Sequence, residues 1–516
     1  MGFLLLSLVI SAGLTDLSNK WTHVVLGFMA LPIAWSLHFI VKRKWTWKSP
    51  EVWALLLAFF TLIGVALAGN PYNALLGWIV LNIGLLVLFA TRTLTPEHRS
   101  VLLIGTLIIG VLWMGWSFLA LHTSVAIPWL PTLSKDPVAL GGFALLPLAT
   151  GATLLKRQSL WKNVLIGIGC GIIVLPIVLP SFSQRLHQDW KTTAQLAPAL
   201  EKVFTSHPWF GIGTDNIQYV YPRFATSHSV FAAQAPSSAL DMLTSYGGVA
   251  LLAFIGLIVA CVYVRPFRVT RERGIFGVAV VLTVTLAFVA NTWQHPALWL
   301  GFWIFIGLLA PPVATSEVSD QTTRKGLRRI IISVSTLFAV QAIVMGLGLN
   351  HFASAERAAL SGDTKNAAKL YAQSLRFDPD PEQRRSYAES LWLNTYQNKD
   401  LAEAEHQARL AYQWNRNDAF ARQVAARVAF SESKYAEAER LYKESLERDP
   451  VFSLDVYISL ADVYKKQGKT SEEIAILKQG LAKYPESPEL PDVMNSGYLQ
   501  QLQTMRERVT TLSKQK

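Results

Sequence analysis

The stretch Gly247 to Val264, GGVALLAFIGLIVACVYV, decides the fold class, because it contains no charged side chain. A helix needs about 20 mostly apolar residues to cross the hydrocarbon core of a bilayer, so this stretch predicts a spanning helix. We count about eleven such runs between Gly2 and Leu349. They lie near 2–14, 24–41, 52–69, 73–91, 101–121, 137–155, 163–181, 247–264, 275–292, 296–313 and 330–349. Residues 1–350 are therefore predicted to form a polytopic membrane helix bundle in an all-α protein.

The composition supports this interpretation. Of 516 residues, 51% are hydrophobic and 16% are charged, which is too apolar for an ordinary soluble protein. A net charge of +12 would suggest nucleic acid if it formed one patch, but the basic residues are divided among alternate loops. Those loops contain Lys42, Arg43, Lys44 and Lys48; Arg92 and Arg99; Lys156, Arg157 and Lys162; Arg265, Arg268, Arg271 and Arg273; and Arg324, Lys325, Arg328 and Arg329.

Basic loops mark the cytoplasmic side of a membrane protein. The N-terminus is then inside, while the segment after Pro180 and the domain after Leu349 are outside. We therefore expect a multi-pass protein of the cytoplasmic membrane. Cys170 and Cys261 lie in predicted spans, so a disulfide framework is excluded.

The composition changes after Leu349, where helical periodicity continues without any run long enough to span. Prolines at 379, 450 and 485 mark a repeat. The residues 17, 8 and 4 positions before each proline are Gly362, Tyr371 and Leu375; Ser433, Tyr442 and Leu446; and Gly468, Leu477 and Leu481. One degenerate repeat fits between the first two prolines, with Trp414 near its mark.

Small residues at the turn, bulky residues on the inner face and proline at the exit resemble the tetratricopeptide (TPR) pattern. The sequence thus predicts an α-solenoid TPR domain over residues 351–488, with a generic helical hairpin array as the alternative. Such a solenoid offers a surface for protein partners. Residues 489–516 are expected to form a solvated C-terminal helix or tail.

A long exterior loop, about residues 182–246, separates two predicted spans. Within it, Arg185 to Ser206 places Leu186, Trp190, Ala197, Leu200 and Phe204 at helical spacing, which predicts an amphipathic helix on the outer leaflet. The stretch HPWFGIG, His207 to Gly213, then ends the helix at proline and allows a tight glycine turn. A nucleotide-binding glycine loop is excluded, because no βαβ unit flanks it.

Together, Arg185 with Trp190, HPWFGIG, the aromatic Tyr-Pro segment and SSALDMLTSYGGVALLAFIGLIVA resemble the O-antigen ligase and polymerase family, which includes bacterial O-oligosaccharyltransferases. The specific similarity covers about Arg185 to Ala260. The resemblance implies transfer of a glycan from a polyprenyl diphosphate carrier to an acceptor on the outer face of the membrane. It implies neither a metal nor another cofactor.

A departing diphosphate needs cations, and guanidinium groups suit phosphate well. Arg185 stands where the family has an arginine, and Arg223 follows the glycine turn. For both arginines, contact with lipid headgroups is the alternative. The family's histidine and acidic residue at the re-entrant helix are replaced here by Pro236-Ser237 and Ser245, so His228 or Asp241 is the candidate base.

His228 could instead be an ordinary loop histidine, and Asp241 could cap a helix. We expect substrate contacts from the remaining candidates of the loop, although His207 could be purely structural at its helix end. These candidates are Trp190, Lys202, His207, Gly211, Gly213 and Tyr221.

Two other functions compete with a metal-independent glycosyltransferase. A membrane-anchored scaffold or docking protein for envelope glycan assembly would use the TPR domain, but it would need one or two spans instead of eleven. A transporter is the third possibility, but the predicted spans contain few ionisable residues of the kind that mark ion pathways.

Overall fold

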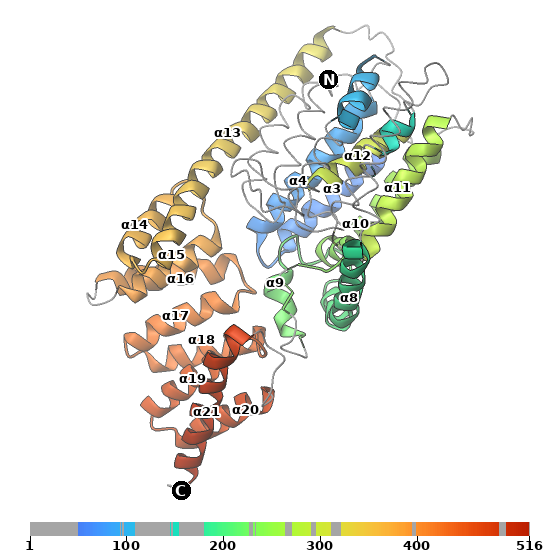
Figure 1. Cartoon of the computed structure of the whole chain (residues 1–516). Coiled ribbons are helices and arrows are strands. Elements are labelled where there is room, and N and C mark those ends of the chain that lie inside the picture. The colour runs from blue at the N-terminus through green and yellow to red at the C-terminus, as the bar shows by residue number, and fades with distance from the viewer. Residues whose placement is uncertain are drawn as a thin grey trace.

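The computed structural model describes residues 50–92, 97–108, 148–153, 180–225, 234–263, 271–289, 296–310, 321–394, 399–484 and 492–514, with a few isolated positions between them. Every regular element in these ranges is a helix. Apolar helices form one lobe and a stack of short hairpins forms the other, with the long helix α13 running along both (Figure 1). The predicted all-α class is confirmed for this part of the chain.

The apolar lobe contains α3 (Pro50–Leu67), α4 (Pro71–Arg92), α10 (Ser238–Tyr263), α11 (Arg271–Val289) and α12 (Pro296–Leu309). Phe302, Trp303 and Phe305 of α12 lie in its core, each no more than 2% exposed. Apolar side chains also point outward, including Phe59, 57% exposed, and Leu252, 67% exposed. An outer surface of this kind suits a lipid environment.

Three of the described helices are long and apolar enough to cross a membrane: Pro50–Leu67, Pro71–Arg92 and Ser238–Val262. Two further apolar stretches, Gly274–Phe288 and Leu298–Leu309, are shorter. The predicted spans at 2–14 and 24–41, and most of those at 101–121, 137–155 and 163–181, lie outside the described residues. The count of eleven spans therefore stays a prediction.

The exterior segment begins with α8 (Pro180–Ser206) and continues through α9 (Ile217–Val220) and the 3-10 turn η2 (Tyr221–Arg223). The predicted amphipathic helix is present, and Leu200 of its predicted apolar face is buried. Leu196, Leu200 and Val203 are at most 3% exposed, whereas Trp190 is 58% exposed. The C-terminal half of α8 packs on the following loop residues, including Ile212 and Val220.

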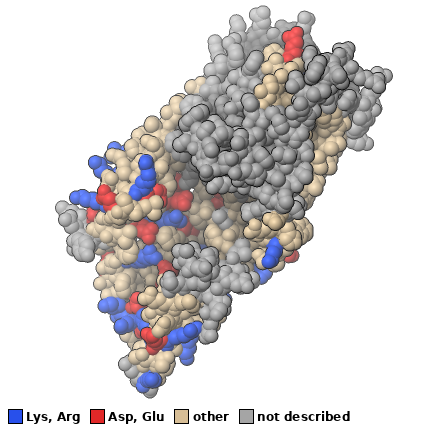
Figure 2. Space-filling model, viewed as in Figure 1, with Lys and Arg blue, Asp and Glu red and all other residues tan. Residues whose placement is uncertain are grey.

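The second lobe is a solenoid of antiparallel helical hairpins. They are formed by α13 (Gln321–Leu360) with α14 (Thr364–Ser374), α15 (Pro381–Leu393) with α16 (Lys399–Trp414), α17 (Ala419–Ser431) with α18 (Tyr435–Arg448), and α19 (Leu454–Lys466) with α20 (Thr470–Lys483). Charged side chains gather over this lobe, whereas the described surface of the apolar lobe is largely uncharged (Figure 2).

The predicted repeat register is confirmed by the backbone. Gly362, Ser433 and Gly468 all have positive φ, at 81°, 62° and 73°, and each lies between the two helices of a hairpin. Tyr371 and Tyr442 are at most 3% exposed, as the inner-face positions require. The degenerate repeat is the α15–α16 hairpin. A hairpin solenoid of TPR-like register is thus shown by the chain itself.

Both ends of this solenoid differ from the expected boundaries. Helix α13 is continuous for 40 residues, so the expected division near residue 350 falls inside a helix. At the other end, α21 (Asp492–Lys514) closes the stack, because Leu502 and Met505 are each 1% exposed and pack in the repeat core. The expected solvated tail is therefore a packed helix.

The two lobes touch through both main chain and side chains. The amide of Arg416 donates to the carbonyl of Gly69 at 2.9 Å. The hydroxyl of Tyr72 donates to the carboxylate of Asp378. Val451 joins the apolar cluster of the exterior loop. The repeat lobe is thus fastened to the turn between α3 and α4 and to the loop after α8.

Candidate functional site

The glycine-rich loop is inserted into an interrupted helix. Helix α10 is broken at Gly247, where φ is 77° and ψ is 177°. In an unbroken helix the amides of residues 248 and 249 would bond the carbonyls of residues 244 and 245. Instead, Gly248 and Val249 donate to Pro208 and Trp209, at 2.8 and 3.2 Å. The freed carbonyls of Thr244 and Ser245 accept from Ile212 and Gly213, each at 2.9 Å.

Two glycines make this close approach possible. Gly211 has φ of 67°, and a Cβ there would lie 2.5 Å from the carbonyl carbon of Ser245. A Cβ on Gly247 would lie 2.5 Å from the amide nitrogen of Gly211. Both positions therefore exclude side chains on steric and conformational grounds. The sequence HPWFGIG and the sequence SYGG are two halves of one main-chain clamp.

The residues after the clamp dock on the turn between α3 and α4. The Asn216 side chain is 1% exposed and donates through Nδ2 to the carbonyl of Ile212 at 2.9 Å and to that of Asn70 at 3.3 Å. The hydroxyl of Thr214 donates to the carbonyl of Asn73 at 3.3 Å. Asp215 is held between them at φ of 55°, an uncommon conformation for a residue other than glycine.

A cavity of about 90 Å³, the membrane-edge cavity, lies beneath this loop. Its polar residues are Thr214, Asp215, Gln234, Asp241 and Tyr246, and its apolar wall includes Trp299, Phe302 and Trp303. The buried indole Nε1 of Trp303 has no hydrogen-bond partner among the described residues. A lining that combines carboxylates with aromatic rings is suited to a polar ligand that carries an apolar face.

Asp241 is held by its own helix. The hydroxyl of Ser245, one turn later, donates to its Oδ1 at 2.9 Å. At its N-terminal end, α10 is fixed by Ser238, which donates to Oδ1 of Asn291 at 3.1 Å, while Asn291 donates to the carbonyl of Ala235 at 2.8 Å. The carboxylate is therefore positioned by a supported helix end, from which it can accept a proton or a hydrogen bond.

The structure places the predicted catalytic residues in different surroundings. Asp241 lines the membrane-edge cavity, and no Lys, Arg or His is among the residues described as lining it. Arg223 is exposed and stacks over the ring of Phe224 at 5.9 Å. Its charge acts on His207 and on Arg448 of the repeat lobe. Asp241 and Arg223 therefore do not line one cavity.

Two predicted catalytic residues cannot be placed fully. Arg185 lies on α8, but its side chain is outside the described residues. His228 lies in the undescribed stretch 226–230. Their roles remain predictions.

The predicted substrate contacts also separate. Gly211 and Gly213 form the clamp, while Trp190 and Lys202 are exposed on α8. Tyr221 is 4% exposed, its ring lies 6.3 Å from that of Phe452 in the repeat lobe, and burial raises its pKa. The buried glycines and Tyr221 hold the loop together and leave little of themselves to a substrate.

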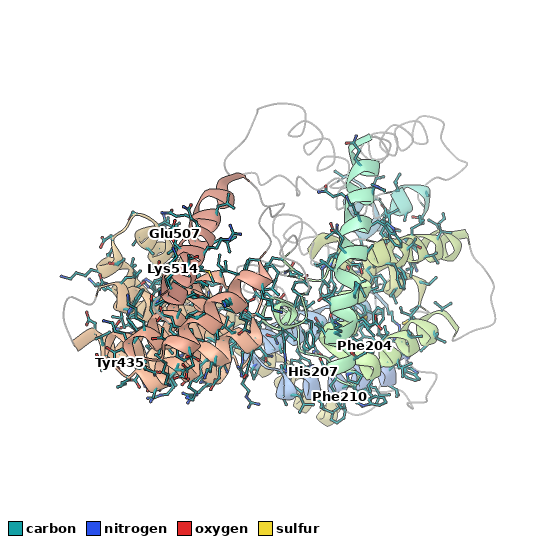
Figure 3. The ribbon with its side chains drawn as sticks, turned by 90° about the horizontal axis from the view of Figure 1, so that it is seen from below. Phe204, His207, Phe210, Tyr435, Glu507 and Lys514 are labelled. Carbon is teal, nitrogen blue, oxygen red and sulfur yellow. The ribbon has the colours of Figure 1, made fainter. Side chains whose placement is uncertain are left out.

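His207 stands at the end of α8, where its main chain holds the start of the clamp. Its carbonyl accepts from Gly211 at 3.1 Å, and its ring Nδ1 lies 2.8 Å from the hydroxyl of Ser206. Desolvation lowers the pKa of His207, a hydrogen bond with the backbone of Val203 opposes this, and the charge of Arg223 lowers the pKa further. Phe204, His207 and Phe210 lie at the same end of the apolar lobe, away from Tyr435 and Glu507 of the repeat lobe (Figure 3).

A second, larger cavity of about 290 Å³, the interlobe cavity, lies between the exterior loop and the solenoid. The loop contributes Gln218, Tyr219, Pro222 and Phe231. The repeat lobe contributes Arg385, Asn417, Asp418, Ala419, Phe420, Gln423, Arg448, Asp449, Phe452, Ser453 and Asp455. Part of the surface expected to bind partners is thus occupied by the chain's own loop.

The sequence interpretation missed Asp215, Tyr246 and Trp303 as cavity residues. Asp215 had a local signal, because an aspartate directly after a glycine turn can adopt positive φ and present its carboxylate. Tyr246 and Trp303 had none, because aromatic residues in apolar runs are ordinarily core residues.

Comparisons with known proteins leave the family open. No family profile and no curated protein matches the chain. The crystal structure of yeast Tom70 is 13% identical over 84% of this chain and 92% of that chain, with a TM-score of 0.24. The crystal structure of the APC/C hetero-tetramer Cut9-Hcn1 is 13% identical over 86% of each chain, with a TM-score of 0.25. Scores this low define no common fold, so the solenoid rests on the chain's own hairpins.

Proposed function

We propose that this protein transfers a glycan from a polyprenyl diphosphate carrier to an acceptor hydroxyl at the outer face of the cytoplasmic membrane. The observation that carries the proposal is the membrane-edge cavity, which is lined by Asp215, Asp241 and aromatic rings and lies beside helices of membrane-spanning length. Aromatic rings suit the apolar faces of sugars, and carboxylates accept hydrogen bonds from hydroxyl groups. The O-antigen ligase resemblance of residues 185–260 supports the same reaction.

In this reaction the acceptor oxygen forms a bond to the anomeric carbon of the glycan. The bond from that carbon to the diphosphate breaks, and polyprenyl diphosphate leaves with the electron pair. The acceptor proton passes to a base, for which Asp241 is the assigned group because Ser245 and the helix end hold it in place. General base catalysis of this kind contributes roughly 10²- to 10⁴-fold.

The departing diphosphate requires a cation, which the described cavity wall does not supply. Arg185 is the candidate, because it stands at the position on α8 where the resembling family has an arginine. Replacement of Arg185 with Lys would keep the charge but lose the two-pronged geometry, so transfer should already decline. The test of Arg223 is separate: Arg223→Ala should change transfer less than Arg185→Ala, since Arg223 lies outside the membrane-edge cavity.

Mass spectrometry of surface glycoconjugates from cells producing each variant tests the reaction. Asp241→Asn should reduce the transferred glycan by roughly two orders of magnitude or more. Glu201→Gln, at an exposed position on α8, is the matched control and should leave transfer unchanged. Parental transfer in both Asp241→Asn and Asp215→Asn would remove the cavity from the mechanism.

A docking function is the second candidate, supported by the inner helices of the solenoid. There, Arg427 pairs with Glu389 at 3.3 Å and Asp455 at 2.9 Å, and its guanidinium lies 5.8 Å from the ring of Phe420. Rows of charged and aromatic groups suit protein contacts. A docking protein would lose surface glycan when the whole chain is deleted, but not when Asp241 alone is changed.

A further inference from the structure

The interlobe cavity is bounded by aromatic rings from both lobes. The ring of Phe231 meets that of Phe452 edge-on, with centroids 5.2 Å apart at 88°. Tyr219 lines the cavity from the loop and Phe420 from α17. Phe231 is 52% exposed although it is a large apolar side chain. An exposed ring at the rim of a cavity is suited to stack on a ligand.

Arg385 is held at the wall of this cavity by two carboxylates and an aromatic ring. Its terminal nitrogens lie 3.4 Å from Asp418 and 3.5 Å from Glu382, which are long distances for charge-assisted hydrogen bonds. Its Nε is buried and has no partner among the described residues. The guanidinium also stacks over Phe420 at 4.9 Å. The Arg385 side chain as a whole is 18% exposed and lines the cavity, so part of its guanidinium can contact a ligand beside the ring.

The charged residues that line the interlobe cavity indicate which kind of ligand it can bind. The cavity contains two guanidinium groups, from Arg385 and Arg448, and three carboxylates, from Asp418, Asp449 and Asp455. This balance does not favour a phosphate or another anion. Donors and acceptors placed together beside rings suit a neutral molecule with many hydroxyl groups. The volume of about 290 Å³ is near the lower end of ligand pockets, which begin at about 300 Å³.

We propose that the interlobe cavity binds a neutral mono- or disaccharide unit of a glycan chain, stacked on Phe231 and Phe452 and hydrogen-bonded by Arg385. The assignment of this unit to the transferred glycan or its acceptor rests on the proposed function. One short segment joins the two sites, because Thr214 and Asp215 line the membrane-edge cavity while Gln218, Tyr219 and Pro222 line the interlobe cavity. Because this segment lines both cavities, we expect a glycan that leaves or enters the membrane-edge cavity to reach the interlobe cavity.

Saturation-transfer NMR on the full chain tests the site directly. The protein is held in a phosphocholine detergent, which carries no sugar, and the probes are N-acetylglucosamine, its β1,4-linked disaccharide and glucuronic acid. A neutral probe should bind more tightly than glucuronic acid. Phe231→Ala and Arg385→Gln should each weaken its binding roughly tenfold, as loss of a central contact does. Phe59→Ala and Arg440→Gln, at exposed positions away from the cavity, should leave it unchanged.

Unchanged binding in both cavity variants, or no binding of any neutral probe, would overturn the inference. If glucuronic acid bound more tightly than the neutral probes, the claim that the cavity favours a neutral ligand would be wrong. Folding is checked by thermal unfolding, and Phe231→Leu, which keeps bulk without a ring, replaces the alanine variant if that variant unfolds. Sugar binding with no transfer would leave this site standing and remove the proposed reaction. Transfer that persists when no sugar binds the interlobe cavity would remove this site and leave the proposed reaction standing.

Discussion

At the scale of single residues, Gly211 and Gly468 share a left-handed backbone but differ in their surroundings. Gly211 is crowded by the carbonyls of Thr244 and Ser245, whereas a Cβ on Gly468 would meet nothing within 4 Å. Gly468→Ala should therefore cost only the conformational penalty, about 1 to 2 kcal/mol. Gly211→Ala adds a main-chain collision, so the thermal unfolding temperature should fall further and transfer should be lost. Equal effects of the two substitutions would show that the clamp is dispensable.

The candidate site could be predicted only in part from the sequence. Asp241 could be picked out because it stands on the helix that resembles the family's re-entrant helix; it lines the membrane-edge cavity, and its role as a base stays a prediction. The tight turn of the clamp could be predicted from its glycines. The break at Gly247 that it pairs with could not, because main-chain hydrogen bonds do not depend on the pattern of side chains. The burial of Tyr221 could not be predicted for a related reason: its contact with Phe452 joins residues far apart in the chain.

At the scale of elements, α21 supports the last hairpin through two buried residues. Met505 is 1% exposed, and its Cε would lie 2.6 Å from a Cβ on Gly480. Met505→Ala should destabilise the repeat lobe by about 2 to 5 kcal/mol, as for other large-to-small changes in cores. Leu499→Ala, on the same helix but at a residue 45% exposed, should change stability by about 0.5 kcal/mol or less. Thermal unfolding followed by circular dichroism measures both, and similar losses would mean that α21 does not pack as described.

Helix α18 is joined to its neighbours by an acid-sensitive contact. Burial opposes the ionisation of Glu439, but hydrogen bonds from Lys443, Lys469 and Gln467 outweigh it and lower its pKa to about 2. Because this pKa is lower than in the unfolded chain, the contact stabilises the fold above about pH 4.3 and is lost as the pH falls toward 2. Glu439→Gln should therefore lower the unfolding temperature at pH 7 much more than at pH 2.5. Glu447→Gln, exposed on the same helix, should show no such difference.

At the scale of the whole molecule, the contacts between the lobes fix which parts share one side of the membrane. The turn at Gly69 touches the repeat lobe at Arg416, and the loop after α8 touches it at Phe452. Cysteines introduced at Lys202 and Lys443, both exposed, should react equally with an impermeant thiol reagent in cells with an accessible outer surface. Cys261 is buried, and Cys170→Ser removes the other native thiol. Labelling of one position and protection of the other would contradict the contact between the lobes.

The fold could be predicted from the sequence where it repeats or where it is uniformly apolar. Gly362 and Gly468 gave the hairpin register because a turn needs a small residue at one fixed place. The union of the lobes could not be predicted, since neither periodicity nor composition encodes a contact between Tyr72 and Asp378. For the same reason the length of α13 was underestimated: a change from apolar to polar residues suggested a boundary, but the helical hydrogen bonds continue through it.

The bond between the amide of Arg416 and the carbonyl of Gly69 affects how this sequence can diverge. It uses main-chain atoms alone, so any residue except proline at position 416 can retain it, and mutations there can accumulate by neutral drift. Substitution of Gly69 is restricted, because a Cβ there would lie 2.2 Å from Nδ2 of Asn417. A larger residue at 69 must arise together with a smaller or displaced side chain at 417. Across descendants of this sequence, a larger residue at position 69 should therefore occur with a displaced or smaller side chain at 417, while the main-chain bond at 416 is retained with any residue except proline.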